Sequence, residues 1–112
     1  MNSDSYISFH EATMMGIKRV DEEICFLLED VYVENQHRSA SVYLKGVSRI
    51  LRDGSPVDDL TMECSDGEIL TLKYRSGSAQ LIIEWNDFKE HSHETRSYQI
   101  DCKAFEVILN PE

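Results

Sequence analysis

The histidines of His91-Ser92-His93 come closest, in residue type and spacing, to a metal site. Imidazoles at positions i and i+2 share one face of an extended chain, and Glu90 and Glu94 flank this pair. A zinc site needs three or four converging ligands, and no third ligand stands at a recognisable spacing. The segment lies in a polar connection between two predicted strands, so we interpret it as a solvated loop that binds no metal.

His10 and Glu11 form a second pair, of the types that serve as general acid and base. No serine lies in a G-x-S-x-G turn, and no nucleophile completes a triad. Walker A, G-x-G-x-x-G and H-E-x-x-H motifs are also missing from the sequence. We therefore expect His10 to bond to backbone at a turn, and we assign no catalytic, cofactor-binding or metal-binding residue.

The cysteines Cys25, Cys64 and Cys102 have neither disulfide-framework nor zinc spacing, so we expect free thiols. The first residues show neither the basic nor the apolar part of a signal peptide. The longest apolar run spans only residues 24–28, far short of the roughly 20 residues that cross a bilayer. These features predict a bacterial or cytosolic protein of the reducing cytoplasm.

Acidic side chains outnumber basic ones by 21 to 11, which gives a formal net charge of −10. Such a chain is repelled by nucleic-acid phosphates and by anionic membranes, so we expect neither as a partner. The densest acidic stretch holds Asp58, Asp59, Glu63, Asp66 and Glu68. It is no EF-hand loop, because Met62 and Cys64 occupy ligand positions. We interpret it as a solvated acidic edge, with a patch for a basic protein partner as the alternative.

Apolar residues recur with a period of two, which is typical of β-strands. Two clean alternating sets flank Ser76-Gly77-Ser78, which predicts a hairpin there. Their members are Leu70, Leu72 and Tyr74 before it, and Leu81, Ile83 and Trp85 after it. Trp85 shares the phase of Leu81 and Ile83, so we place its side chain in the core.

Other runs are less regular. Residues 24–33 and residues 41–51 each change phase, the second at Gly46, which predicts a bulge or bend in each strand. A first strand is expected over residues 14–20. Ser65-Asp66-Gly67 reads as a tight turn, and polar connections are expected at 35–39, 52–59 and 87–94.

The stretch from Pro56 to Cys64 has a helical spacing of apolar residues, and Asp58 and Asp59 could cap such a helix. We allow one short helix there at most. Together, the patterns predict a single β-rich domain over residues 1–112. Its expected architecture is an antiparallel sandwich or partly open barrel of about seven or eight strands.

Four short motifs carry a family resemblance: Phe9-His10-Glu11-Ala12-Thr13, Asp66-Gly67-Glu68-Ile69-Leu70, Leu81-Ile82-Ile83-Glu84-Trp85 and Tyr98-Gln99-Ile100. The chain resembles small uncharacterised bacterial proteins that begin with an F-H-[DE]-[AST] element and continue as a β-meander. Some of these are grouped with immunity proteins of bacterial toxin systems. The resemblance implies a β-rich fold and supplies no activity and no functional residue.

We therefore expect a non-catalytic acidic protein–protein interaction domain, immunity-like or adaptor, with a basic protein as partner. Tyr6, Tyr32 and Tyr43 are the expected surface anchors. The alternative is a small-molecule binding module with a pocket between sheets near Trp85 or Tyr98. A metal-assisted enzyme that uses the two loop histidines is the third hypothesis. The sequence does not indicate an oligomeric state.

Overall fold

The computed structural model describes residues 7–111, and every regular element in that range is a β-strand. The strands are β1 (Ile7–Ser8), β2 (Thr13–Val20), β3 (Glu23–Val33), β4 (Gln36–Lys45), β5 (Arg49–Arg52), β6 (Ser55–Val57), β7 (Asp66–Arg75), β8 (Ser78–Asp87), β9 (Ser92–Asp101) and β10 (Ala104–Leu109). The predicted β-rich fold is confirmed. The ten strands exceed the expected seven or eight, because short strands such as β1, β5 and β6 leave little alternation to detect.

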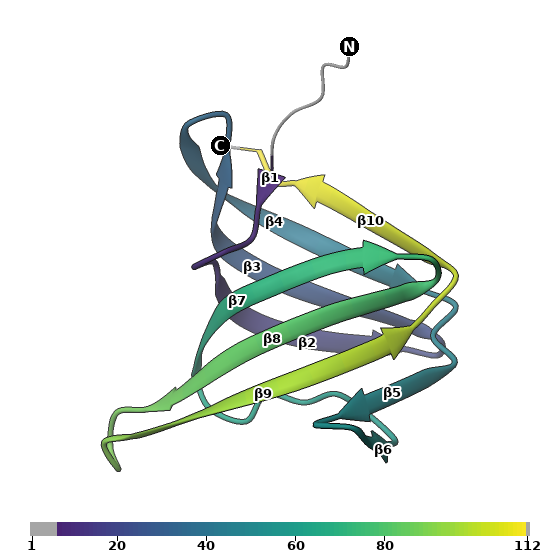
Figure 1. The fold of residues 1–112 in the computed structure, drawn as a ribbon. Coiled ribbons are helices and arrows are strands. Elements are labelled where there is room, and N and C mark those ends of the chain that lie inside the picture. Colours follow the sequence, from purple (N-terminus) through teal and green to yellow (C-terminus); the bar gives the residue numbers. More distant parts are fainter. Residues whose placement is uncertain (1–6, 112) are drawn as a thin grey trace.

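The strands form one antiparallel sheet with the order β10-β4-β3-β2-β7-β8-β9-β5-β6, while β1 pairs with β3. The sheet folds back on itself, so that two layers face each other (Figure 1). We call β10, β4, β3 and β2 the back layer, and β7, β8, β9, β5 and β6 the front layer. Strands β10 and β6 end the order, so the sheet is not closed.

The two layers meet where β2 runs beside β7. Thr13 pairs with Glu68 across this junction. The backbone N–H of Glu11 donates to the Ile69 carbonyl oxygen at 2.7 Å, and the Ile69 N–H donates to the Ala12 carbonyl oxygen at 2.7 Å. This short seam is the hydrogen-bonded link that makes one sheet of two layers.

The core lies between the layers and contains Trp85, whose side chain is 1% exposed. The predicted core position of Trp85 is therefore confirmed. The ring covers Gly67, where an added Cβ would lie 2.7 Å from Trp85 Cζ3. The predicted turn at Ser65-Asp66-Gly67 is wrong, because β7 already begins at Asp66. Gly67 is accommodated here by its lack of a side chain rather than by a turn conformation.

Three hairpins use two-residue turns with positive φ at both residues, and one of them is Asp53-Gly54, which joins β5 to β6 with φ of 51° and 86°. Ser76 and Gly77 have φ of 52° and 80° and join β7 to β8, as predicted. Glu34 and Asn35, with φ of 49° and 69°, join β3 to β4. Such turns match the twist of paired strands. The expected polar connection at 35–39 is therefore wrong beyond Asn35, because β4 starts at Gln36.

The two predicted phase changes have different structural causes. In β3, the register against β4 shifts between Leu28 and Val31, which confirms an irregularity there. At Gly46, whose φ is 68°, the strand instead ends, and the next strand pairs with β9 in the front layer. A crossing between layers changes the phase of a sequence pattern just as a bulge does.

No helix forms between Pro56 and Cys64, which agrees with the expected limit of one short helix at most. Residues 55–57 form β6, and the chain is irregular from residue 58 to residue 65. Asp59 does not cap a helix; its Oδ1 accepts the N–H of the next residue, Leu60, at 2.8 Å. Leu60 is buried in the core, so tertiary packing, not helical periodicity, explains its apolar character.

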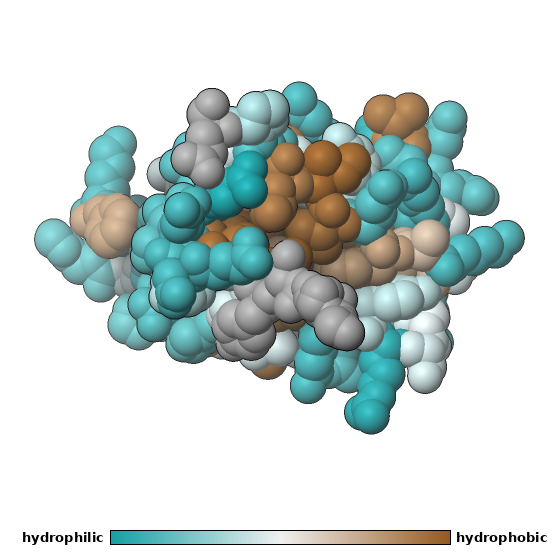
Figure 2. Space-filling view, turned by 90° about the horizontal axis from the view of Figure 1, so that it is seen from above, coloured by the Kyte–Doolittle hydropathy of each residue, from teal (hydrophilic) through white to brown (hydrophobic). Residues whose placement is uncertain are grey.

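The open end of the sheet leaves apolar side chains partly uncovered. Phe105, Val107 and Leu109 of β10 pack against the core, yet they are only half-buried. Phe105 stacks on Tyr74 of β7, with ring centroids 5.4 Å apart. Figure 2 looks down on the molecule from the side where β10 lies in Figure 1 and shows an apolar patch among hydrophilic residues.

Candidate interaction site around Cys64

A hydrogen-bonded chain runs from the core to the surface beside the β8–β9 hairpin. Trp85 Nε1–H donates to the Tyr98 hydroxyl oxygen at 2.9 Å, and the Tyr98 O–H donates to Glu63 Oε2 at 3.2 Å. Burial is the main cause that raises the pKa of Tyr98 to about 12; the Trp85 hydrogen bond opposes the rise and Glu63 adds to it. Tyr98 is therefore a neutral donor at physiological pH.

Two arginines hold Glu63 at the surface end of this chain. Arg52 Nη1 lies 3.0 Å from Glu63 Oε2, and Arg96 Nε lies 3.3 Å from Glu63 Oε1. Arg96 also binds Asp53 Oδ2 at 2.8 Å and Glu94 Oε2 at 3.1 Å. The network links β5, β9 and the irregular segment before β7, and so positions the Glu63 carboxylate.

Cys64 lies beside this network, half-buried among four carboxylates. Burial is the main cause that raises the pKa of the Cys64 thiol, and Asp87, Glu63, Glu94 and Asp66 raise it further. We call these four residues the acidic cluster. A thiol kept protonated is a poor nucleophile and a poor metal ligand. Over residues 7–111, no group of three or more His, Cys, Asp or Glu residues is arranged to hold a metal ion.

Two hollows border the acidic cluster and share Glu63, Cys64 and Asp87 in their walls. Their volumes are about 340 Å³ and about 210 Å³. Phe88 lines the larger hollow and is 72% exposed. An exposed aromatic ring beside carboxylates suits a cationic side chain, because a guanidinium group stacks on the ring while it binds an acid.

Two carboxylates of the acidic cluster keep an uncompensated charge. Within the described part of the chain, no ion pair joins Asp66 or Asp87 to a basic side chain. Asp66 accepts a hydrogen bond from Asn86 Nδ2 at 2.9 Å. Asp87 Oδ1 accepts the backbone N–H groups of Lys89 and Glu90 at 3.1 and 3.2 Å, which shapes the hairpin loop.

The histidines considered for metal binding lie at the tip of this hairpin. His91 is in the loop with φ of 53°, whereas His93 is in β9 opposite Asn86. The expected polar connection at 87–94 is therefore shorter, from residue 88 to residue 91. Both histidine side chains are exposed, as expected for a solvated segment. His93 also lines the smaller hollow.

The His10–Glu11 pair lies at the junction of the layers. His10 Nδ1 is 3.0 Å from the carbonyl oxygen of Leu70, and Nε2 is 3.6 Å from Glu11 Oε2. The expectation that His10 bonds to backbone is confirmed.

The acidic stretch of the sequence is divided between different surroundings. Asp59 forms an ion pair with Arg19 at 3.2 Å, and Glu68 stands opposite Glu84 on the β7–β8 pair. Only Glu63 and Asp66 belong to the acidic cluster. The expected single acidic edge is therefore not formed, because Asp59 lies at Arg19 of β2, Glu63 lies at Arg96 of β9, and Glu68 is within β7.

Sequence reasoning missed Phe88, Arg96 and Asp53. Phe88 is the single aromatic residue in the polar connection 87–94, and that contrast is a usable signal. Arg96 and Asp53 are 43 residues apart and meet only through the pairing of β9 with β5. Tyr32 and Tyr43 are half-buried, and Tyr6 lies outside the described residues.

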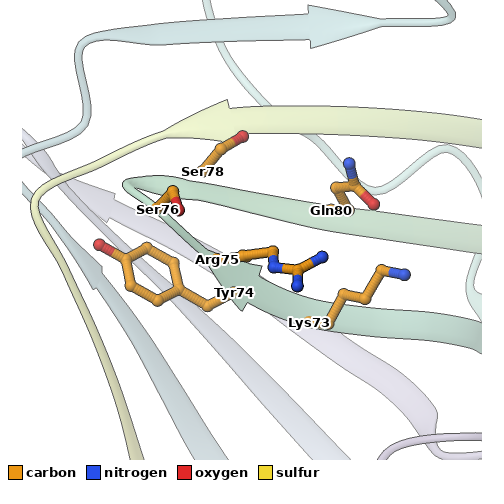
Figure 3. Close-up of a pocket in the computed structure, with 6 residues that line it drawn as sticks. All are labelled: Lys73, Tyr74, Arg75, Ser76, Ser78 and Gln80. Carbon is orange, nitrogen blue, oxygen red and sulfur yellow. The ribbon is translucent and has the colours of Figure 1, made fainter.

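A larger cavity, of about 350 Å³, lies beside the β7–β8 turn. Figure 3 shows Lys73 and Arg75 extending from β7 on the side of Gln80, while Tyr74 points away from them. Trp85 and Tyr98, around which a pocket between the sheets was expected, are 1% and 3% exposed, and Trp85 also lines the smaller hollow at the acidic cluster. The small-molecule hypothesis stays a prediction.

Comparison of the chain with protein-family models, with curated protein sequences and with solved structures finds no match. The resemblance to small bacterial β-rich proteins thus stays a prediction from the motifs named above. Over residues 7–111, no helix has the length and apolar character that a membrane span requires.

Proposed function

We propose that this chain is a non-catalytic protein–protein interaction domain that binds a basic partner at the acidic cluster. The proposal rests on one arrangement above all. Phe88, 72% exposed, lies in the wall of a hollow that also contains Cys64 and the carboxylates of Glu63 and Asp87. Aromatic residues and arginines are the commonest anchors of protein interfaces, and this hollow offers an aromatic ring and acids to an arginine.

The net charge of the chain supports a basic partner. A formal charge of −10 attracts a positively charged protein and raises the rate of encounter. Charges act over about 8 Å at physiological salt, so the docking site is determined by charged residues close to the contact. Asp66 and Asp87 are such residues, because no basic side chain of the described residues forms an ion pair with them.

The chemistry of the site supports binding rather than catalysis. The raised pKa of Cys64 disfavours the thiolate that a nucleophile needs. The hydroxyl of Tyr98 is held between Trp85 and Glu63 and has a pKa of about 12, so it is a weak acid. Both groups suit a rigid wall for a docked side chain.

The immunity-like role is the concrete form of this proposal, and an adaptor role is its alternative. The immunity-like form is supported by the motif resemblance, and it predicts that a toxin gene lies next to the gene for this chain. The toxin should then be neutralised by the wild-type protein and poorly neutralised by Phe88→Ala and Asp87→Asn.

The binding site itself is testable without knowledge of the partner. We would titrate ¹⁵N-labelled protein with a short arginine–glycine peptide and follow the amide signals by NMR. The largest shifts are expected at Cys64, Asp87 and Phe88. Asp87→Asn and Phe88→Ala should each weaken binding several-fold, since each removes one contact of the bound guanidinium group.

Glu29→Gln provides the matched control, because it removes one exposed negative charge from β3 in the back layer. It should leave peptide affinity close to that of the wild type. The same peptide with glutamate in place of arginine should not bind. Shifts spread evenly over all exposed carboxylates, or an equal loss in Glu29→Gln, would contradict the proposed site.

A further inference from the structure

The outer face of the back layer is a four-stranded surface on which no described strand lies (Figure 1). The alternate residues of β3 and β4 that point inward are fully buried, so the remaining ones point outward. Strand register aligns these outward residues into rows that run from β10 through β4 and β3 to β2. Three such rows matter here.

The first row carries no charge. It consists of Ile108, Ser41, Leu27 and Gly16, which are paired in turn across the four strands. Ile108 is 45% exposed. This row of apolar and small residues lies at one end of the three rows, and Ser41 within it is buried.

The second row places opposite charges at its two ends. Glu106 lies on β10 and Lys18 lies on β2, with Tyr43 and Cys25 between them. Burial raises the pKa of Cys25; Tyr43 and then Lys18 act in the opposite direction, and Glu23 adds a small further rise. These interactions agree with a shared outward face.

The third row consists of Ala104, Lys45, Glu23 and Val20 on β10, β4, β3 and β2. Its positive charge is on the β10 side and its negative charge on the β2 side, which is the opposite of the second row. Ala104 pairs with Lys45, and Glu23 pairs with Val20. Lys45 and Glu23 stand at adjacent positions because their neighbours Leu44 and Ile24 are paired. Lys45 Nζ lies 3.0 Å from Glu106 Oε1 of the second row.

The charges of these rows are complementary to themselves under one symmetry operation. A two-fold axis that runs along the strands, between β3 and β4, exchanges β4 with β3 and β10 with β2. Glu106 then faces Lys18 of the second copy, and Lys45 faces Glu23 of the second copy. In the first row, Ile108 faces Gly16, so that a large side chain meets a residue without one.

A two-fold axis across the strands does not make the charges of two copies complementary. A two-fold axis that runs across the strands along the second row would place Glu106 opposite Glu106 and Lys18 opposite Lys18. Like charges face to face destabilise an interface. The complementarity is therefore specific to one arrangement of two copies.

We propose that the chain forms a symmetric dimer through the outer face of its back layer, with the two-fold axis along the strands between β3 and β4. Strands about 4.8 Å apart give the four-stranded face a width of about 19 Å, and its length over three rows is about 20 Å. Two such faces together cover roughly 760 Å², less than the roughly 1,200 Å² that stable specific interfaces bury, so the dimer is weak and reversible.

The first experiment measures mass against protein concentration by sedimentation equilibrium at constant salt. The wild type should pass from monomer to dimer as its concentration rises into the high micromolar range. Lys18→Glu and Glu106→Lys should each raise the dissociation constant by about tenfold or more, because each variant brings two like-charged pairs together.

The decisive experiment mixes these two variants. In the mixed dimer, Glu106 of the first variant faces Lys18 of the second, and the introduced Glu and Lys face each other. An equimolar mixture should therefore dimerise about as well as the wild type, although neither variant does so alone.

Lys73→Glu is the matched control, because it makes the same charge change at an exposed position of β7 in the front layer. It should dimerise like the wild type. Circular dichroism of each variant shows whether it is folded. A wild type that stays monomeric throughout, variants that dimerise unchanged, or a mixture that stays monomeric would each overturn the proposal.

Discussion

The front and back layers share one core, yet their outward-facing side chains behave differently. In the front layer, outward polar groups bind one another: Arg49 lies 2.9 Å from Asp101 Oδ2, and Gln99 donates to Asp101 Oδ1 at 3.1 Å. In the back layer, the row of Ile108, Ser41, Leu27 and Gly16 has no charge to pair. The two layers thus alternate buried residues equally but have different outer surfaces: the front one is polar, and the back one carries the Lys45–Glu106 ion pair beside an uncharged row.

The layers also differ in how the core reaches the surface. In the front layer, Trp85 is linked through Tyr98 to Glu63 and its arginines. In the back layer, β10 ends the sheet, and Phe105 is only half-buried. We therefore expect the front layer to be the more sensitive to truncation and to added volume.

The largest expected effect is that of Trp85→Ala. Removal of this buried ring should lower the free energy of unfolding by about 3–5 kcal/mol. Phe105→Ala, the matched truncation in the back layer, should cost clearly less, because its ring already contacts water. Urea denaturation followed by circular dichroism measures both, and equal losses would contradict the difference between the layers.

A methyl group added at a glycine should also destabilise the front layer more than the back layer. Gly67→Ala places a Cβ 2.7 Å from Trp85 Cζ3 and should cost about 1–3 kcal/mol. Gly16→Ala should be nearly neutral, since its Cβ meets Leu27 Cδ1 at 3.4 Å. In a Trp85→Phe background, which lacks the second ring, Gly67→Ala should cost less than in the wild type. An unchanged cost in this double-mutant cycle would show that another contact is responsible.

The link from core to surface is tested by Tyr98→Phe. Loss of the hydroxyl leaves the buried Trp85 N–H without its acceptor, and this should lower stability by about 1–2 kcal/mol. Tyr43→Phe on the outer face of the back layer should stay within about 0.5 kcal/mol of the wild type. Chemical denaturation checks both variants. A neutral Tyr98→Phe would mean that the bond to Trp85 adds nothing to the fold.

The smallest expected effect is a change in how stability depends on acidic pH. The backbone N–H of Ser97, and then Arg96, lower the pKa of Asp53 from its ordinary value of 3.8. A depressed pKa in the folded state means that Asp53 adds stability above its unfolded pKa, and that this share is lost as pH falls through the folded value. Asp53→Asn should therefore be less stable at neutral pH and lose less stability than the wild type below about pH 4. Melting temperatures across this range measure the difference, with Glu29→Gln as the control for loss of a charge.

Local pattern alone predicted a good part of the fold. Period-two alternation identified the main strands, and Ser76-Gly77 marked a hairpin, because both signals depend on neighbouring residues. The core position of Trp85 followed from its phase with Leu81 and Ile83. The candidate site was much less predictable. His91 and His93 drew attention by their spacing, whereas Phe88 and Asp87, beside them in sequence, carry the proposed interaction.

The sequence by itself therefore determined which residues alternate between core and surface. This alternation depends only on the geometry of a single extended chain. The tertiary structure alone decided that Gly46 ends a strand rather than bulging it, and that Gly67 lies beneath Trp85. It also brought Asp53 and Glu63 to Arg96, and aligned Glu106 with Lys18 in one row. Contacts of this kind depend on strand order and register, which are set by the packing of the whole sheet. The spacing of neighbouring residues in the sequence does not reveal them.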